Sequence, residues 1–119
     1  MADAGEAERV AEARARIKEM TPAAAIARKD AGDALFLDVR EQSEWNLFRI
    51  PGAVHVPIGT LGGAAEQAVP RDRDVIVYCN AGSRSILATD QLRAMGYTRV
   101  ASLTGGVRAW MDAGGELED

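Results

Sequence analysis

Residues 74–85 read DVIVYCNAGSRS, and this stretch decides the fold. Its first part, Asp74 to Tyr78, is a short run of mostly β-branched and aromatic residues, which is typical of a strand buried on both faces of a sheet. A helical pattern of apolar residues follows from about Ser83 to Met95. A buried strand that leads into a helix through a few small residues is half of a βαβ unit, so the stretch predicts an α/β fold.

The rest of the chain repeats this alternation of short apolar runs and helical patterns. Strands are predicted over residues 34–38, 53–57, 74–78 and 98–103. Helices are predicted over residues 3–20, 22–29, 60–68, 83–95 and 106–113, with a helical turn over 41–48. The alternation predicts a parallel sheet with helices on both faces. Ligands of such sheets bind beyond the carboxyl ends of the strands, where Asp38, Cys79 and Thr104 are expected.

The two ends of the chain carry weaker signals. Asp3 and Glu6 predict a capping box for the first helix, and apolar residues recur at helical spacing as far as Met20. This helix either packs against its own domain or forms a contact surface for a partner or a second copy of the chain. The acidic segment GGELED at residues 114–119 is expected to fray.

Composition excludes several classes of function. A chain of 119 residues is expected to fold as one domain, and its net charge of −4 argues against nucleic-acid binding. No apolar run approaches the roughly 18 residues of a membrane-spanning helix, and the N-terminus lacks a secretory signal, so a cytoplasmic, reducing location is expected. The single cysteine rules out an internal disulfide and a zinc site of several thiolates. We expect neither a metal nor a cofactor.

The single thiol, Cys79, stands at the end of the predicted strand and begins a loop of small residues. A tight curl into a helix turns successive N–H groups inward to form an anion-binding nest, and the helix dipole adds partial positive charge there. Both effects stabilise the thiolate, which is the nucleophilic form. A buried structural cysteine is the alternative, but a place between strand and loop, followed by Gly82 and Arg84, favours a reactive thiol. The residues expected to form the site around Cys79 are Asn80, Ala81, Gly82, Ser83, Arg84 and Ser85.

Three sequence segments together resemble the rhodanese (sulfurtransferase) family. Residues 75–110 resemble its catalytic half, and FLDVREQSEW (36–45) and IPGAVHVP (50–57) resemble signature stretches of its first half. The resemblance covers about residues 21–117. It implies a three-layer fold with a five-stranded parallel sheet, a rhodanese domain over residues 21–119 and an N-terminal helical extension over residues 1–20. The family usually has Gly-His before Ile-Pro-Gly-Ala, and this chain has Phe48-Arg49.

The resemblance also implies a reaction in which the cysteine accepts a sulfane sulfur and becomes a persulfide. Cys79 is then expected to attack the outer sulfur of thiosulfate or a similar anion. The acceptor, cyanide or a thiol, must be a separate molecule because the chain has no second cysteine. A rhodanese-like docking module, or a relay that hands the persulfide to a partner protein, is the alternative.

Phosphatases and arsenate reductases of the same fold are a less favoured alternative. The resemblance implies that they need five residues between cysteine and arginine, and only four separate Cys79 from Arg84 here. The loop also lacks an Asp or His that could act as the acid for a leaving group. Sulfur transfer is therefore the favoured reaction.

Three charged residues outside the loop are candidate supports for it: Asp38, Arg40 and Glu44. Arg84 either contacts the substrate anion or braces the loop by pairing with Asp38 or Glu44, and bracing is favoured. The resemblance implies that Asp38 and Arg40 are structural.

Overall fold

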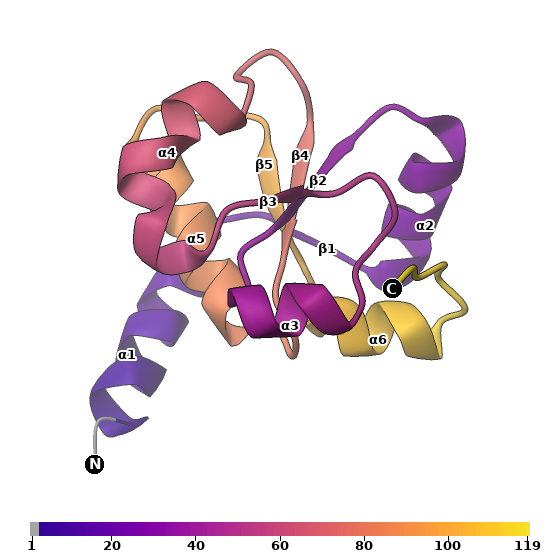
Figure 1. Ribbon diagram of the computed structural model, residues 1–119. Coiled ribbons are helices and arrows are strands. Elements are labelled where there is room, and N and C mark those ends of the chain that lie inside the picture. The colour runs from indigo at the N-terminus through magenta and orange to yellow at the C-terminus, as the bar shows by residue number, and fades with distance from the viewer. Residues whose placement is uncertain (1–2) are drawn as a thin grey trace.

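The computed structural model describes residues 3–119, with side chains from residue 5 onward. Within these residues five strands form one sheet in the order β1-β5-β4-β2-β3, and all paired strands are parallel. The strands are β1 (Glu19–Met20), β2 (Leu35–Asp38), β3 (Val54–His55), β4 (Val75–Tyr78) and β5 (Val100–Leu103). The predicted α/β fold with a parallel sheet is therefore confirmed (Figure 1).

Helices cover both faces of the sheet. They are α1 (Asp3–Arg14), α2 (Pro22–Ala31), α3 (Gln42–Leu47), α4 (Leu61–Ala68), α5 (Ser83–Ala94) and α6 (Gly106–Asp112), with a 3-10 turn η1 (Ile58–Thr60) before α4. Figure 1 shows α4 and α5 on one side of the sheet, and α2 and α6 on the other. This arrangement gives the molecule three layers.

The alternation of side chains along β4 builds a separate core on each face. Val75 and Val77 belong to the core cluster that α4 and α5 cover, whereas Ile76 and Tyr78 belong to the cluster beneath α2 and α6. All four residues are buried, as expected of a central parallel strand with helices on both faces. Cys79, directly after β4, lies in the first cluster.

Two helix ends follow their local sequence signals. The Thr21 side chain accepts a hydrogen bond from the Ala24 N–H at 3.2 Å, and Pro22 occupies the first turn of α2. At the end of α5, Gly96 takes a φ of +98°, which only glycine adopts at little cost. Both local predictions are confirmed.

The predicted first helix over residues 3–20 is too long. It ends at Arg14, and Glu19–Met20 form β1, which pairs with Ser102 and Leu103 at the edge of the sheet. Met20 still packs into the core, but it does so from a strand. The Asp3 side chain of the predicted capping box lies outside the described residues. The boundary at residue 20 between an extension and a domain stays a prediction.

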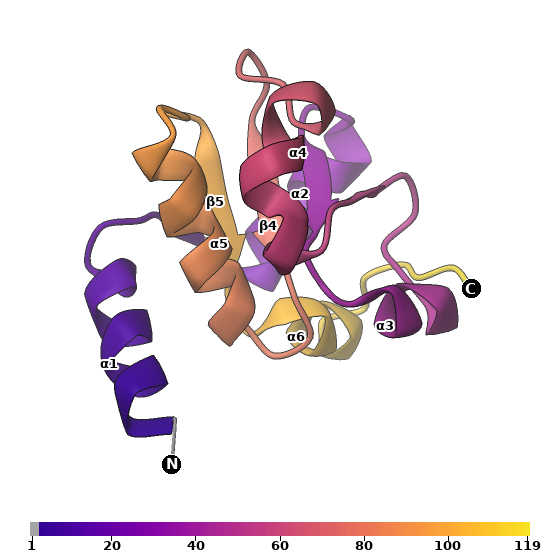
Figure 2. The ribbon, with the colours of Figure 1, turned by 60° about the vertical axis from the view of Figure 1, so that its left-hand side comes forward.

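The first helix packs against its own domain along α5 (Figure 2). Ala13 is buried, and the Arg16 guanidinium after the helix donates to both carboxylate oxygens of Asp90 at 3.1 and 2.8 Å. Asp90 lies on α5, the helix that begins at the predicted catalytic loop. The N-terminal segment is therefore attached to the element that carries the site.

The acidic C-terminal segment does not fray, contrary to the expectation. The Trp110 indole N–H donates to the Glu116 carbonyl at 2.8 Å. Residues Arg49 and Glu118 exchange two backbone hydrogen bonds, at 2.8 and 2.9 Å, in an antiparallel bridge. The segment is thus held to the loop between α3 and β3. Within residues 3–119, no helix is long and apolar enough to cross a membrane.

Candidate active site

The predicted reactive thiol lies at the carboxyl edge of the sheet. Cys79 follows the last residue of β4, and α5 begins four residues later at Ser83. Gly82, between them, has a φ of +109°, where a side chain would be strained, and its position lets the chain turn from strand to helix within a few residues. Figures 1 and 2 show this loop at the start of α5, close to the start of α6.

Backbone amides converge on the sulfur. The Gly82 N–H donates to Cys79 Sγ at 3.0 Å and the Ser85 N–H donates at 3.4 Å. The thiol itself donates to Ser85 Oγ at 3.5 Å. Cys79 is fully buried, so these donors act where water screens them little. The predicted nest is therefore present around the sulfur.

A buried polar network continues from Ser85 into the sheet. Ser85 Oγ lies 2.9 Å from Ser102 Oγ and donates to the Gly82 carbonyl at 3.3 Å. The Thr89 hydroxyl donates to the Ser85 carbonyl at 2.7 Å. Ser102 was not among the predicted site residues. Its signal is a single hydroxyl in the otherwise apolar strand VASL, since a buried hydroxyl needs a partner.

The start of α6 supports the loop from behind. The Val107 N–H donates to the Cys79 carbonyl at 2.8 Å, and the Arg108 N–H donates to the Asn80 carbonyl at 3.1 Å. These contacts give each of the two carbonyls a hydrogen-bond donor from α6. A Cβ at Gly106 would lie 2.5 Å from the Asn80 oxygen, so only glycine allows this approach. The prediction missed Gly106, although the Gly105-Gly106 pair after a strand was its signal.

Arg84 braces the loop against α3. Its guanidinium donates to both Glu44 carboxylate oxygens at 2.7 and 2.9 Å. The hydrogen bond from Arg84, acting against partial burial, lowers the pKa of Glu44 from 4.5 to about 2. The same contact raises the pKa of Arg84. Of the two carboxylates predicted as partners of Arg84, the structure pairs it with Glu44.

Asp38 and Arg40 form a separate buried pair. Arg40 Nη2 lies 2.8 Å from Asp38 Oδ2, and both side chains are almost fully buried. Arg40 also donates to the Phe48 carbonyl, and its guanidinium lies over the Phe48 and Tyr78 rings. The hydrogen bonds of this pair among the described residues do not reach the loop around Cys79. Asp38 and Arg40 thus join β2 to the segment after α3.

The unusual Phe48-Arg49 pair lies in the same region. Arg49 places its guanidinium 4.7 Å from the centre of the Trp45 ring, and that ring stacks on His55 at 4.6 Å. His55 Nε2 in turn lies 2.8 Å from the Arg40 carbonyl. The Arg49 side chain therefore packs on Trp45, and its backbone is paired with Glu118 of the C-terminal segment.

The arrangement suits chemistry at a single sulfur atom. Fixed N–H donors around a buried sulfur stabilise a negative charge on it without reorganisation. No second cysteine exists in the chain to resolve an intermediate. Among the described residues no group of three or more His, Cys, Asp or Glu side chains is placed to hold a metal ion.

Comparisons with known proteins agree with this fold. The sequence profile of the rhodanese-like domain matches residues 21–113. A sulfurtransferase of Allochromatium vinosum is 38% identical over 68% of this chain and 75% of its own length. The human thiosulfate:glutathione sulfurtransferase is 30% identical over 69% of this chain and 83% of its own length. Some other relatives are longer: the chain covers 51% of a putative sulfur carrier protein of Bacillus subtilis, at 32% identity.

A solved structure matches over most of both chains. A protein of unknown function from Rhodopseudomonas palustris, described as a possible tyrosine phosphatase, superposes with a TM-score of 0.84. It is 34% identical, and the match covers 92% of this chain and 90% of that one. The profile covers most of the chain, and the sulfurtransferase of Allochromatium vinosum is more than 30% identical to it. The chain belongs to the rhodanese-like sulfurtransferase family.

Proposed function

We propose that this protein transfers a sulfane sulfur from thiosulfate, or a similar anion, through a persulfide on Cys79 to cyanide or a small thiol. The observation that carries the proposal is the pair of backbone N–H groups, from Gly82 and Ser85, that donate to Cys79 Sγ at 3.0 and 3.4 Å. Such donors stabilise both the attacking thiolate and the anionic product. The loop residues 80–85 form the proposed binding site, and Arg84 and Glu44 hold it in place.

The reaction consists of two displacements at sulfur. The Cys79 thiolate attacks the outer sulfur of thiosulfate, a new S–S bond forms, and the old S–S bond breaks with its electron pair leaving on sulfite. The enzyme then carries a persulfide anion. Cyanide attacks the outer sulfur to give thiocyanate, or a thiolate attacks it to give a small-molecule persulfide, and either step restores the Cys79 thiolate.

The size of the loop favours sulfur transfer over phosphate chemistry. Four residues separate Cys79 from Arg84, and the guanidinium of Arg84 is engaged with Glu44 at 2.7 Å. A phosphatase needs that cation and the amides to surround three phosphate oxygens at once. The loop also offers no Asp or His as an acid for the leaving alkoxide.

Mass spectrometry of the intact protein tests the proposal. After treatment with thiosulfate, the protein should gain the mass of one sulfur atom, and cyanide should remove it while thiocyanate appears in solution. The Cys79→Ser variant should gain nothing. An unmodified wild-type protein, or an adduct that survives in Cys79→Ser, would refute the proposal. Hydrolysis of p-nitrophenyl phosphate by the wild type at a higher rate than thiocyanate formation would support the phosphatase alternative.

A groove beside the loop supports a second candidate, delivery of the sulfur to a partner protein. The groove has a volume of about 410 Å³, and its walls are Glu6, Ala7, Val10, Ala11 and Arg14 of α1 and Ser83 of the loop. Removal of residues 1–20 would be an unsuitable test, because it would also remove β1 from the sheet. Point substitutions on the groove leave the sheet intact.

Two exposed alanines provide a matched test of this alternative. Ala11→Glu changes the groove, and Ala27→Glu makes the same change on the surface of α2. If a partner protein docks on α1, Ala11→Glu should lower sulfur transfer to a small protein with one exposed cysteine and leave transfer to cyanide unchanged. Equal rates for both variants with both acceptors would contradict the relay.

A further inference from the structure

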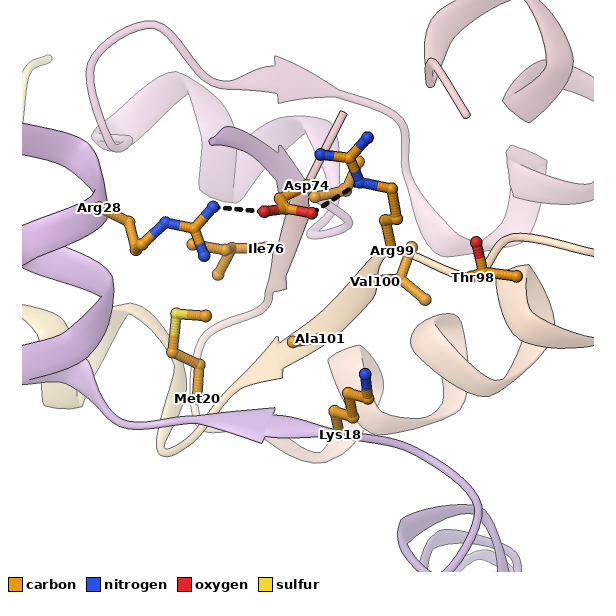
Figure 3. Close-up of a pocket in the computed structure, with 10 residues that line it drawn as sticks. Lys18, Met20, Arg28, Asp74, Ile76, Thr98, Arg99, Val100 and Ala101 are labelled. Atoms are coloured by element: carbon orange, nitrogen blue, oxygen red, sulfur yellow. Dashed lines mark hydrogen bonds and ion pairs between the residues drawn. The ribbon is translucent and has the colours of Figure 1, made fainter. Parts of the chain in front are cut away.

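A second pocket lies at the opposite end of the sheet from Cys79. It is found where β4 and β5 begin, between α2 and the segment that leads into β1 (Figure 3). Its volume is about 200 Å³, room for roughly seven water-sized groups. Because β4 runs from this pocket towards Cys79, the pocket is separate from the candidate active site.

The floor of this pocket is apolar because the edge strand is short. β1 pairs with β5 only at Ser102 and Leu103, so the preceding residues, Val100 and Ala101, pair with β4 on one side and have no strand on the other. These two are the most exposed members of the hydrophobic core, each at 9%. Met20, Val75 and Ile76 complete the apolar lining. The side chains of Val75 and Val100 belong to the core cluster on the other face of the sheet, so Met20, Ile76 and Ala101 form the floor. An apolar floor open to solvent favours a ligand with a nonpolar part.

The walls carry more positive than negative charge. Lys18, Arg28 and Arg99 line the pocket from three different segments, and Asp74 is the one acidic residue among the lining residues. Both oxygens of Asp74 are already bound, Oδ2 by Arg28 at 2.6 Å and Oδ1 by Arg99 at 2.8 Å. Asp33, outside the lining, also accepts from Arg28 at 2.6 Å.

Two of these cations retain donors for a ligand. Within the described part of the chain, the Lys18 ammonium forms no ion pair, and Arg28 Nη1 forms no hydrogen bond. Figure 3 shows Lys18 and Arg28 on opposite sides of the pocket, with Ile76 and Ala101 between them. A carboxylate placed between an ammonium and a guanidinium gains charge-assisted hydrogen bonds from both.

We propose that this pocket binds a small organic monocarboxylate, with the carboxylate between Lys18 and Arg28 and the nonpolar body on Met20, Ile76 and Ala101. The charge of the walls selects an anion, the apolar floor selects a hydrocarbon body, and the volume limits the ligand to a few carbon atoms beyond the carboxylate. The site is independent of sulfur transfer, so its test requires no activity measurement.

Titration with hexanoate, followed by NMR of backbone amides and methyl groups, tests this site. Saturating shifts should centre on Met20, Ile76 and Ala101, and the loop around Cys79 should stay unperturbed. Hexylamine has the same body with the opposite charge, and inorganic phosphate has the charge without the body. Both should bind at least fivefold more weakly than hexanoate. Equal binding of either one, or hexanoate shifts located elsewhere, would overturn the proposal.

The two lysines of the chain provide a matched pair of variants. Lys18→Met should weaken hexanoate binding at least fivefold, whereas Lys29→Met, on α2 and outside the lining, should change it less than twofold. Ala101→Leu fills the floor and should abolish binding. Urea midpoints establish that each variant is folded. If Ala101→Leu does not fold, the lysine pair still decides, and equal affinities for the two lysine variants would refute the assignment.

Discussion

The ion pair between Arg84 and Glu44 joins the loop of the candidate active site to α3, and its contribution to stability should depend on pH. Glu44→Gln keeps the size of the side chain and removes its charge. The fall in the pKa of Glu44 from 4.5 to about 2 corresponds to at most roughly 3 kcal/mol of stabilisation. Because both side chains are 30% exposed, solvent screening reduces this, and we expect a loss of about 1–2 kcal/mol at neutral pH.

The direction of the pH dependence follows from the lowered pKa of Glu44. A carboxylate whose pKa is lower in the folded state stabilises the protein fully above its unfolded pKa, and this stabilisation is lost as the pH falls towards the folded pKa. The difference in unfolding free energy between wild type and Glu44→Gln should therefore be largest above pH 4.5 and shrink as the pH approaches about 2. Urea unfolding of both proteins, followed by circular dichroism across this range, measures the difference.

A second carboxylate serves as the control for this measurement. Glu66 pairs with Arg71 on the surface, where both side chains are more exposed than those of Glu44 and Arg84. Glu66→Gln should therefore destabilise the protein less than Glu44→Gln does. The reasoning fails if the Glu44→Gln difference keeps the same size down to the lowest pH, or if Glu66→Gln costs as much.

Three further changes have definite expected outcomes. Gly106→Ala should lower the free energy of unfolding in urea by about 2–3 kcal/mol and slow persulfide formation, because its Cβ would lie 2.5 Å from the Asn80 oxygen. Gly114→Ala is the control: its φ is also positive but the space around it is open, so it should lower the free energy of unfolding by only about 1 kcal/mol. Tyr78→Phe leaves the buried Ile50 N–H without its acceptor and should cost about 1–3 kcal/mol in the same assay. Arg16→Gln should speed amide hydrogen exchange in α1 and leave exchange in β4 unchanged, because Arg16 attaches that helix to α5.

Local sequence signals predicted the central elements of the fold and missed its edge. The predicted strand at residues 74–78 is found at 75–78, and the predicted helix at residues 83–95 ends at Ala94. β1 has two residues and pairs with a strand more than eighty positions away, so no local periodicity marks it. The apolar spacing up to Met20 predicted a helix that continues to this residue. Met20 packs against the core from a strand instead, and its apolar side chain alone does not distinguish a helix from a strand.

The parts of the candidate site that were predicted are likewise local in the sequence, and the parts that were missed come from distant segments. Cys79 and the loop after it were identified because thiol, small residues and arginine are contiguous in the sequence. Ser102 and Gly106 reach the loop from β5 and from the start of α6, and only the fold brings them there. The docked C-terminal segment has the same cause, since Glu118 pairs with Arg49 from a distant part of the chain.

Contacts from three directions hold the loop, and this predicts which kinetic step each type of substitution affects. Ser102 reaches it from β5, the Val107 N–H from α6, and Glu44 from α3. All three fix amides that donate to the sulfur. In the proposed reaction, negative charge is on Cys79 Sγ when it attacks the donor, and again when it departs as the acceptor takes the outer sulfur. Loosening any one of these contacts should therefore slow both half-reactions. A change at the groove of α1 touches none of them, so it should affect only the second half-reaction, and only with a bulky acceptor.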